Sequence, residues 1–428
     1  MTATGPARPI RLSANTRPRR GHLSVTGGAG AVFRTADGQS FTDLSSQTLN
    51  LLFGQAHPVV TEAVVDQVRT ATFFDQDFDS PSDLAALHRL AALLPDHLLA
   101  FNLRMSNGSD AVESAVKQAR RATGRSRVLT VDGIYLGQTT QAIHLRGWGE
   151  PPTDILRGST EDVVRAPLPY CAEDDHDPAD CPVENGEHLL RAIERDQDVL
   201  ACVLLDPIMI SSGVFGGRHG SMALLLRRVA EACRATGVPL VMDECQTFGW
   251  VPDHTLAGHW GLRPDALVLG KGVAGGFPLA VCASTPELDN LQWGEADYTH
   301  GGHPASVAAM AATCGLLADP AERDRFAELT RVLDESLAED GRGTARGRAT
   351  TRSRGIGLIR ALEVLTDGRP AAPELVRAVS DRCLRQGVYV RPYGSNLGLK
   401  PSRVMPPELL KSALATVQDA IDAELAGV

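Results

Sequence analysis

Long apolar runs are missing from this sequence. No stretch of 18 or more apolar residues occurs, which excludes a transmembrane helix. The first 21 residues carry five arginines and no apolar stretch, so we expect a loose N-terminal arm rather than a secretory signal. The net charge of −10 gives no electrostatic support for nucleic-acid binding. These absences predict a cytoplasmic protein that binds neither membranes nor nucleic acids.

Cysteine spacing typical of metal or redox sites is also missing, since none of the eight cysteines belongs to a Cys-x-x-Cys pair. Most of them lie in apolar runs, as small core residues do in a reducing cytosol. Cys171 and Cys181 flank an acidic loop at residues 169–187, where a disulfide or two free thiols would fit. Free thiols are favoured, and the loop is predicted to be a solvated insertion.

Lysine is scarce, with 4 lysines against 38 arginines. One of the four, Lys271, follows the apolar run 266–269 and is flanked by glycines. Apolar surroundings favour a neutral amine, which can form a Schiff base with an aldehyde. Upstream, the apolar run 239–242 leads into Asp243, and a carboxylate there can keep a pyridine nitrogen protonated. Lys271 and Asp243 together predict a site for pyridoxal phosphate (PLP).

Apolar runs and helical patterns alternate through the middle of the chain. Helical stretches separate several of five apolar runs, at residues 128–131, 200–205, 239–242, 266–269 and 279–283. This alternation predicts an α/β fold with a mostly parallel sheet covered on both faces. Ligands of such sheets bind at the carboxyl ends of the strands, where Asp206, Asp243 and Lys271 all lie.

A chain of 428 residues is long enough for a main domain and a smaller one. We expect an N-terminal arm and small-domain segment at 1–60, a large cofactor-binding domain at 61–317, and a small α+β C-terminal domain at 318–428. Alternation around Asp37-Gly38 predicts a β-hairpin at residues 30–43. In the C-terminal part, residues 355–364 and 387–393 are predicted strands and 407–425 a closing helix.

Three further motifs fall at the same edge of the predicted sheet. Gly108 and Ser109 precede a helical pattern, where free amides, a hydroxyl group and the positive end of the helix dipole suit a phosphate. An ordinary N-cap is the alternative. Tyr135 can stack on a flat ring, although a core or rim tyrosine explains it equally well. Gln246, three residues after Asp243, can hydrogen-bond a ring hydroxyl.

Two histidines three residues apart, His300 and His303, raise the question of a metal site. The surrounding glycines and Pro304 keep them off a shared helical face, and no carboxylate or cysteine joins them at metal-ligand spacing. A turn before an apolar helix at 305–317 is the favoured interpretation, and no metal is expected.

In their order along the chain, these motifs resemble those of the class III (omega) aminotransferases of PLP fold type I. The resemblance covers about residues 37–407. The matching segments are Gly54-Gln-Ala-His57-Pro58, 106–113, Tyr135-Leu-Gly137, Asp206-Pro207, Asp243-Glu-Cys-Gln246-Thr, Pro264-Asp265 with Gly270-Lys271-Gly272, 299–304 and Arg354-Gly-Ile-Gly357-Leu358. Each match is short, but eight in the same order are specific. The resemblance implies an aspartate-aminotransferase-like fold.

The resemblance also implies roles for residues around the ring of the cofactor. Lys271 would form the Schiff base with PLP and later carry the proton between the substrate carbon and the cofactor. Asp243 would pair with the pyridine nitrogen, and Gln246 would reach the ring oxygen. Tyr135 would cover the ring.

The phosphate of the cofactor has two implied sets of contacts. Gly108 and Ser109 would hold it from within the same chain. Thr299 would reach the phosphate of the neighbouring subunit. The resemblance therefore implies a homodimer with shared active sites.

A departure from the family pattern concerns the substrate. Members that act on amino acids commonly carry an arginine for the α-carboxylate near the C-terminus, and the corresponding position here is Gly398. Arg391 or Arg403 can substitute for it. If neither does, an amine or amino-sugar substrate is favoured.

A second feature that bears on the substrate is segment 73–79, which lies near the active-site entrance in this family. Asp75, Asp77 and Asp79 would attract a polycation, and the neighbouring phenylalanines can support a sugar face or an ammonium group. A solvated turn with the phenylalanines packed inward is an equal alternative.

The sequence therefore predicts a PLP-dependent aminotransferase that moves an amino group between a primary amine and a 2-oxo acid. The arginine-rich, lysine-poor composition suggests a high-GC coding source, and family members in such organisms serve aminoglycoside antibiotic biosynthesis. By that analogy the expected amine is an amino sugar. The alternative is a PLP-dependent isomerase, epimerase or dehydratase on the same scaffold, because the same lysine serves those reactions.

Overall fold

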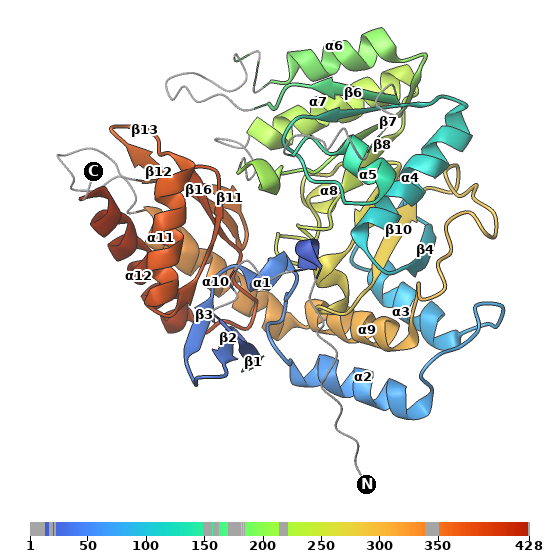
Figure 1. Ribbon diagram of the computed structural model, residues 1–428. Coiled ribbons are helices and arrows are strands. Elements are labelled where there is room, and N and C mark those ends of the chain that lie inside the picture. Colours follow the sequence, from blue (N-terminus) through green and yellow to red (C-terminus); the bar gives the residue numbers. More distant parts are fainter. Residues whose placement is uncertain are drawn as a thin grey trace, which may run out of the picture.

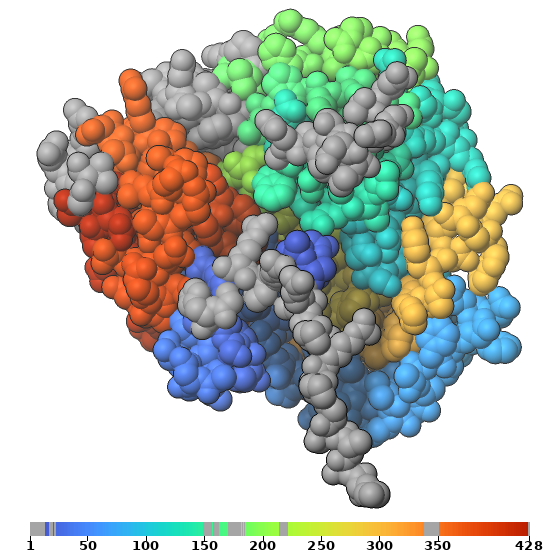
Figure 2. All heavy atoms as spheres, viewed as in Figure 1, coloured from blue at the N-terminus to red at the C-terminus, as the bar shows by residue number. Residues whose placement is uncertain are grey.

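The computed structural model describes residues 13–16, 20, 23–148, 156, 162–169, 181, 183, 185–213, 221–338 and 351–426. Most of the N-terminal arm and of the acidic loop, with Cys171, lies outside these ranges. Figure 1 shows the C-terminal elements on one side, a large sheet on the other, and α1 (Ser46–Leu49) between them. In Figure 2 the orange and red C-terminal residues and the green and cyan central residues occupy opposite sides of the same view.

Seven strands form the large sheet, in the order β4-β10-β9-β8-β7-β5-β6. Their bounds are β4 Ala100–Met105, β5 Arg127–Val131, β6 Val163–Ala166, β7 Leu200–Leu205, β8 Leu240–Asp243, β9 Ala266–Leu269 and β10 Ala280–Ser284. Only β10 runs antiparallel to its neighbours. Every residue of β7, β8 and β9 is buried, which explains why the sequence shows continuous apolar runs instead of alternation. The prediction of a mostly parallel α/β sheet is confirmed.

Helices pack on this sheet and on one another. The longer ones are α2 Pro58–Thr70, α3 Pro81–Ala91, α4 Gly108–Thr123, α6 Glu187–Asp196, α7 Ser221–Thr236, α9 Pro304–Ala318, α10 Pro320–Ala338, α11 Pro373–Arg385 and α12 Pro407–Leu425. The short ones are α5 Thr140–Leu145, α8 Leu256–His259, and three 3-10 turns, η1 Ala14–Thr16, η3 Ile210–Ser212 and η4 Lys271–Ala274. α4 packs on β7, β9 and β10, and α2 and α3 pack on α9.

The position of α4 follows directly from its sequence. Asn107 caps the N-terminus with its side chain, and Gly124 ends the helix in the left-handed conformation at φ 68°. Ala111, Ala115 and Ala119 repeat every four residues and are fully buried, so the helix lies close to the sheet. This packing fixes the N-terminus of α4 at the carboxyl edge of β4.

The structure has two smaller sheets, and the first of them joins the two ends of the chain. One has the order β1-β2-β3-β14, and the other has the order β11-β12-β16-β15 with β13 beside β12. The bounds are β1 Val25–Ala29, β2 Val32–Thr35, β3 Ser40–Asp43, β11 Thr351–Ile356, β12 Ile359–Thr366, β13 Arg369–Pro370, β14 Val388–Tyr389, β15 Arg391–Tyr393 and β16 Asn396–Leu399. β3 and β14 are parallel, so strands from both ends of the chain share one sheet. The domain limits at residues 60 and 317 stay a prediction.

The prediction of one strand over residues 355–364 is wrong. The chain turns at Gly357-Leu358, between β11 and β12, which pair as a hairpin. Gly357 has a φ of 59°, and a methyl group on it would lie 2.5 Å from the carbonyl oxygen of Trp250. Glycine is therefore required at this turn. The predicted strand at 387–393 likewise divides into β14 and β15.

Two further expectations concern membranes and cysteines. In the described ranges no helix combines the length and apolar character that crossing a membrane requires. The seven cysteines in those ranges, Cys181 included, are buried and form no disulfide.

Candidate active site

Three charged side chains stand at the carboxyl ends of adjacent parallel strands. Asp206 follows β7, Asp243 ends β8, and Lys271 comes two residues after β9. The strand registers bring these three ends to the same edge of the sheet. The structure thus brings together Lys271 and Asp243, the pair on which the prediction of a PLP site depends.

Cys245 is the point where three segments of the site meet. A methyl group on Gly108 would lie 2.9 Å from its sulfur, and so would one on Gly270. The N-terminus of α4, the loop after Asp243 and the residue before Lys271 therefore touch the same atom. Burial raises the pKa of the Cys245 thiol well above its ordinary value, so it is a neutral spacer and not a nucleophile.

The two carboxylates of the site are buried and interact. Asp243 is 6% exposed, and its Oδ1 accepts a hydrogen bond of 3.0 Å from the amide of Cys245. Burial raises the pKa of Asp243, while the Cys245 amide and the charge of Lys271 oppose that rise. Burial raises the pKa of Asp206 to about 6, and the charge of Asp243 adds to the effect. Lys271 is thus the positive charge that balances a buried acidic pair.

Gln246 connects the loop after Asp243 to Asp206. Its Nε2 donates to Oδ2 of Asp206 at 3.3 Å. The other oxygen of Asp206 accepts hydrogen bonds from the amides of Ile208 and Met209, at 3.1 and 2.9 Å. The side-chain orientation of Gln246 is therefore fixed by Asp206. The role of Gln246 toward a ring oxygen stays a prediction.

The N-terminus of α4 at Gly108 has an ordinary side-chain cap, which was the alternative to a phosphate site. Asn107 Oδ1 accepts from the amides of Ser109 and Asp110, at 2.9 and 3.2 Å. The hydroxyl of Ser109 accepts from the amide of Gln138 at 3.1 Å, which leaves its own hydrogen to donate to a ligand. The cap and a phosphate site are therefore compatible, with the Ser109 hydroxyl and the helix dipole as the groups that remain for an anion.

Tyr135 lies in the loop that follows β5, next to the phosphate loop. A methyl group on Gly137 would lie 2.5 Å from the hydroxyl oxygen of Ser109, so the two loops are in direct contact. The Tyr135 ring is half-buried and packs edge-on against Trp148, with ring centroids 5.8 Å apart. The structure thus brings Tyr135 to the edge of the sheet that carries Lys271.

Lys271 has a strained backbone. Its φ is 45°, in the left-handed region that non-glycine residues rarely adopt. Such strain persists where the surrounding structure enforces it, commonly at functional sites. The half-buried amine of Lys271 matches the aldehyde of PLP, and the buried acid on the next strand matches its ring nitrogen. The helix N-terminus with a free hydroxyl hydrogen matches its phosphate. The residues present therefore fit the cofactor.

The contact between Gly108 and Cys245 leads to a prediction. In Gly108→Ala, the new methyl group must displace the Cys245 sulfur, an overpacking that costs about 1–3 kcal/mol. We expect PLP to bind at least about tenfold more weakly, as measured by absorbance titration. Adding Cys245→Ala should restore the affinity by making room for the methyl group.

A matched control exists at the other end of the same helix. Gly124 has no atom within 4 Å of an added methyl group, although its φ of 68° would strain an alanine. Gly124→Ala should therefore lower the melting temperature and leave PLP affinity unchanged. Equal weakening in both variants would mean that the Gly108 effect arises from global destabilisation.

The remaining predicted site residues form a separate group. Gln76 Nε2 donates to the carbonyls of Tyr298 and Thr299, at 2.7 and 3.2 Å, so segment 73–79 lies against the Thr299 turn. Thr299 is exposed, as are the three aspartates of that segment, Asp75, Asp77 and Asp79. Across the described ranges, no hydrogen bond or ion pair joins this group to Lys271. The structure therefore does not connect these four residues to the Lys271 cluster within one chain.

The two histidines of the Thr299 turn have structural contacts. His303 Nδ1 accepts from the amide of Ala305 at 3.3 Å and caps α9. The ring of Phe73 lies about 6 Å from the rings of both His300 and His303. In the described part of the chain, no group of three or more potential metal ligands occurs.

One residue of the site was missed by the sequence analysis. Lys400 is 1% exposed, and its Nζ donates to the backbone carbonyl of Gln246 at 2.6 Å. It is one of only four lysines, which was the available signal. The sequence analysis considered the neighbouring Gly398, because it replaces an arginine of the family pattern, and gave Lys400 no role.

Comparisons with known proteins show the family to which the chain belongs. A family model described as aminotransferase class-III matches residues 14–421. The 4-aminobutyrate aminotransferase of Mycobacterium leprae is 28% identical over 409 residues, which cover 91% of this chain and 89% of that protein. The acetylornithine aminotransferase of Corynebacterium efficiens is 28% identical over 411 residues, which cover 94% of this chain and 93% of that protein.

Solved structures show the same fold. The PMP-bound form of an aminotransferase from Vibrio fluvialis superimposes with a TM-score of 0.84 at 20% identity, and the match covers 96% of this chain and 94% of that chain. The resemblance predicted from the order of the motifs is confirmed by the family match. The chain therefore belongs to the class-III aminotransferase family and is a PLP-dependent enzyme of fold type I.

Proposed function

We propose that this enzyme moves an amino group between a primary amine and a 2-oxo acid, with an amino sugar as the amine. The observation that carries this proposal is the meeting of Lys271, Asp243 and the N-terminus of α4 around Cys245. These groups supply an amine, a counter-charge and an anion site at one edge of the sheet.

Each residue has a defined task in this proposal. Bound PLP supplies an aldehyde and an electron-accepting ring. Lys271 would provide the amine that holds the cofactor and would move a proton at Nζ to and from the reacting carbon of the substrate. Asp243 keeps the ring nitrogen protonated, and its burial makes that charge pair strong. The Ser109 hydroxyl orients the phosphate.

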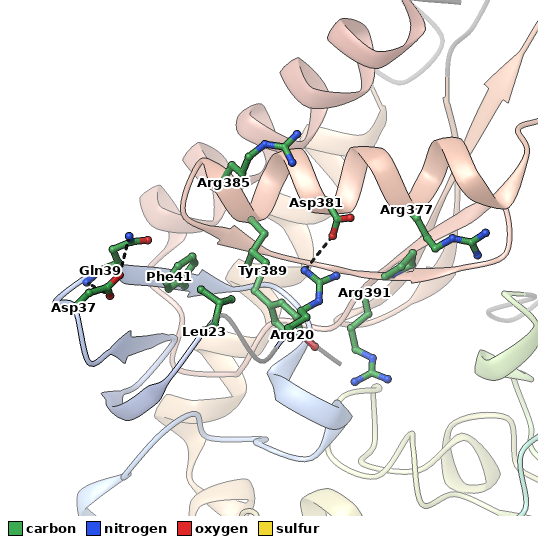
Figure 3. Close-up of a pocket in the computed structure, with 12 residues that line it drawn as sticks. Arg20, Leu23, Asp37, Gln39, Phe41, Arg377, Asp381, Arg385, Tyr389 and Arg391 are labelled. Carbon is green, nitrogen blue, oxygen red and sulfur yellow. Dashed lines mark hydrogen bonds and ion pairs between the residues drawn. The ribbon is translucent and has the colours of Figure 1, made fainter. Parts of the chain in front are cut away.

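The 2-oxo acid requires a positive group for its carboxylate, and Arg391 supports this role. Arg391 in β15 is the direct cross-strand partner of Gly398 in β16. Directly opposed residues of antiparallel strands point to the same face of the sheet, so Arg391 presents its guanidinium beside the position that lacks the family arginine. It lines a cavity of about 1210 Å³ to which none of the residues around Lys271 contributes, and Figure 3 shows its side chain extending away from α11.

Arg403 is not available for the same task. It is 2% exposed, and its Nη1 and Nη2 donate to the carbonyls of Gly249 and Glu322, at 2.7 and 3.0 Å. Its guanidinium also stacks on the Phe326 ring, 4.5 Å from the centroid. These contacts commit Arg403 to the fold and leave Arg391 as the candidate for the carboxylate.

We expect Arg391→Met to raise the KM for the 2-oxo acid about 10- to 100-fold, because a charged hydrogen bond contributes about 1.5–3 kcal/mol. The KM for the amine should change less, since an amino sugar has no carboxylate. The control is Arg385→Met, which removes an arginine from the same cavity on α11. Equal changes in both KM values, or an effect of Arg385→Met, would argue against carboxylate binding by Arg391.

The amino-sugar assignment is supported by segment 73–79. Asp75, Asp77 and Asp79 are exposed on one short loop, and Phe78 beside them is 70% exposed. Such a surface attracts polyamines and offers a ring to a sugar face. The primary amine of an aminoglycoside-type substrate fits this combination of acids and an aromatic ring.

We also propose a homodimer with shared active sites. Thr299 is exposed, as a residue that reaches a neighbouring subunit must be. It lies beside segment 73–79, near the end of β4. In that arrangement the three aspartates would face the partner's site and would belong to its entrance.

The experiment that tests the function uses the purified protein loaded with PLP. Diamines, amino acids and amino sugars are added one by one, and bleaching of the visible absorption band identifies the amine. A 2-oxo acid is then added, and its consumption distinguishes amino transfer from the isomerase, epimerase or dehydratase alternative, which uses no acceptor. Loss of amine without consumption of the acceptor would favour that alternative.

A further inference from the structure

A buried charged cluster lies on one face of the small C-terminal sheet formed by β11, β12, β16 and β15. Glu363 in β12 is the direct cross-strand partner of Arg352 in β11 and of Asn396 in β16. Arg354 lies two residues beyond Arg352 along β11, so these side chains point to the same face. Glu363 forms ion pairs with Arg352 at 3.0 Å and with Arg354 at 3.2 Å. The side chains of Glu363 and Arg354 are only 2% and 6% exposed, so both charges have been removed from water.

The guanidinium of Arg354 also reaches a residue outside the sheet. Its Nε and Nη2 both donate to the backbone carbonyl of Gly213, with a distance of 3.0 Å for Nε. Nη2 donates to Oδ1 of Asn396 as well, at 2.8 Å. A planar guanidinium presents its N–H groups as a fork, so two of them can hold one carbonyl. Gly213 directly follows η3, so Arg354 joins the small C-terminal sheet to segment 206–213 after β7.

The end of segment 206–213 packs closely on this sheet. Gly213 has a φ of 74°, and a methyl group on it would lie 2.4 Å from Nδ2 of Asn396. That Nδ2 donates to the carbonyl of Tyr393 at 3.3 Å. Asn396 and Tyr393 are paired residues of β16 and β15, and β15 also carries Arg391. The segment therefore contacts the strand pair that presents Arg391.

The other end of the segment belongs to the candidate active site. Asp206 accepts hydrogen bonds from the amide of Met209 at 2.9 Å and from Nε2 of Gln246 at 3.3 Å. The carbonyl of Met209 in turn accepts from the amide of Ser212 at 3.0 Å, and Met209 has a positive φ of 49°. Because the segment is wound tightly between Asp206 and Gly213, its two ends move together.

The segment also touches the loop that follows β5. A methyl group on Gly133 would lie 2.1 Å from the hydroxyl oxygen of Ser212. Gly133 precedes Tyr135 by two residues. Segment 206–213 is thus in contact with two loops at the edge of the large sheet and with the small C-terminal sheet.

We propose that Arg354 is a positioning residue: it holds segment 206–213 against the small C-terminal sheet and so sets where the strand pair with Arg391 lies relative to the large sheet. The proposal rests on the function proposed above, in which Arg391 binds the carboxylate of the 2-oxo acid and Lys271 serves its reacting carbon. These two tasks belong to different sheets. A substrate that must satisfy both requires a fixed relation between the sheets.

Arg360 provides a matched control on the neighbouring strand β12. It is 7% exposed, and its Nη2 donates to Asp334 of α10 at 2.7 Å. Arg354 and Arg360 are both buried arginines of the same sheet with an acidic partner. Replacing either by methionine leaves that acid without its partner and should lower the melting temperature. Only Arg354→Met removes a contact to segment 206–213.

The first measurement is hydrogen exchange of the full-length protein without cofactor, followed by mass spectrometry. In Arg354→Met we expect the amides of segment 206–213 to exchange about 10- to 100-fold faster, because the charged hydrogen bonds to the Gly213 carbonyl are lost. In Arg360→Met the same amides should exchange as in the wild type.

The second measurement uses the enzyme loaded with PLP and determines the KM of each substrate separately. Arg354→Met should raise the KM for the 2-oxo acid about tenfold and change the KM for the amine less. Combined with Arg391→Met, it should raise that KM no further, because a misplaced and an absent arginine cause the same loss. Two independent effects would instead add.

A second variant keeps the proposal testable if Arg354→Met does not fold. Gly213→Ala drives the new methyl group against Asn396 and changes no charge, so it should speed the exchange of segment 206–213 and raise the KM for the 2-oxo acid. Its control is Gly124→Ala, which strains a similar φ of 68° without any collision.

Unchanged exchange of segment 206–213, an unchanged KM for the 2-oxo acid, or equal effects in Arg360→Met would overturn the proposal. A wild type that takes up no PLP and consumes no 2-oxo acid would overturn the proposed function instead. The exchange measurement needs neither PLP nor substrate, so the two failures are distinguishable.

Discussion

Lys271→Ala should yield a protein that is colourless after exposure to PLP and removal of free PLP, and that transfers no amino group. The wild type should be yellow, because PLP joined to an amine absorbs in the visible range. No other lysine can replace Lys271: Lys400 is held by two carbonyls, Lys117 donates to the Glu295 carbonyl at 2.8 Å, and Lys411 lies on the exposed face of α12. We expect activity to fall by at least about 10⁴-fold, since both the nucleophile and the general base are lost.

The control for this prediction is Lys411→Ala, which changes the lysine count equally. It should keep the colour and the activity. The measurements are the visible spectrum after gel filtration and the rate of 2-oxo acid consumption. A coloured Lys271→Ala protein would show that another amine holds the cofactor, and the assignment of the site would then be wrong.

Asp243→Asn should produce the second largest effect. The substitution keeps the shape of the side chain and removes the charge that keeps the ring nitrogen protonated. Removing one buried electrostatic partner of a reacting group costs about 10²–10³ in kcat, and we expect a loss at the upper end of that range. PLP should still bind to Lys271, so the visible band should remain while turnover falls. Stopped-flow measurement of the bleaching rate separates these two effects.

Asp206→Asn is the matched control, because it changes the other buried acid of the pair. It weakens the contacts to the Ile208 and Met209 amides and should lower stability more than rate. The pair also gives a pH signature: the charge of Asp243 contributes to raising the pKa of Asp206 to about 6, so Asp243→Asn should lower the pKa of Asp206. A rate loss in Asp206→Asn equal to that in Asp243→Asn would contradict the assigned roles.

Much of the large sheet could be predicted because its strands are buried on both faces. Runs such as Leu200–Leu205 are apolar throughout, and three of them are followed within two residues by a charged side chain, Asp206, Asp243 or Lys271. The candidate site was predictable for the same reason, since parallel strands bring Asp243 and Lys271 to one edge whatever the loops do. The turn at Gly357-Leu358 was missed because apolar residues continue on both sides of it.

The rest depends on contacts between residues far apart in the chain. Nothing near Lys400 in sequence shows that its ammonium binds the carbonyls of Leu49 and Gln246. Similarly, the sequence alone suggests that an arginine is missing at Gly398. Only the pairing of β15 with β16 shows that Arg391 lies directly across from that position. Side-chain identity is local information, whereas strand pairing and burial are properties of the folded chain.

The parallel pairing of β3 with β14 has a consequence for synthesis of the protein on the ribosome. β3 precedes every strand of the large sheet in the chain, and its partner β14 follows all of them. Until β14 is made, one edge of the first sheet has unpaired backbone groups, which can recruit other nascent chains. All the strands of the large sheet are made before β14 emerges. The edge of β3 must therefore stay exposed, or be protected by a chaperone, while that whole sheet is synthesised.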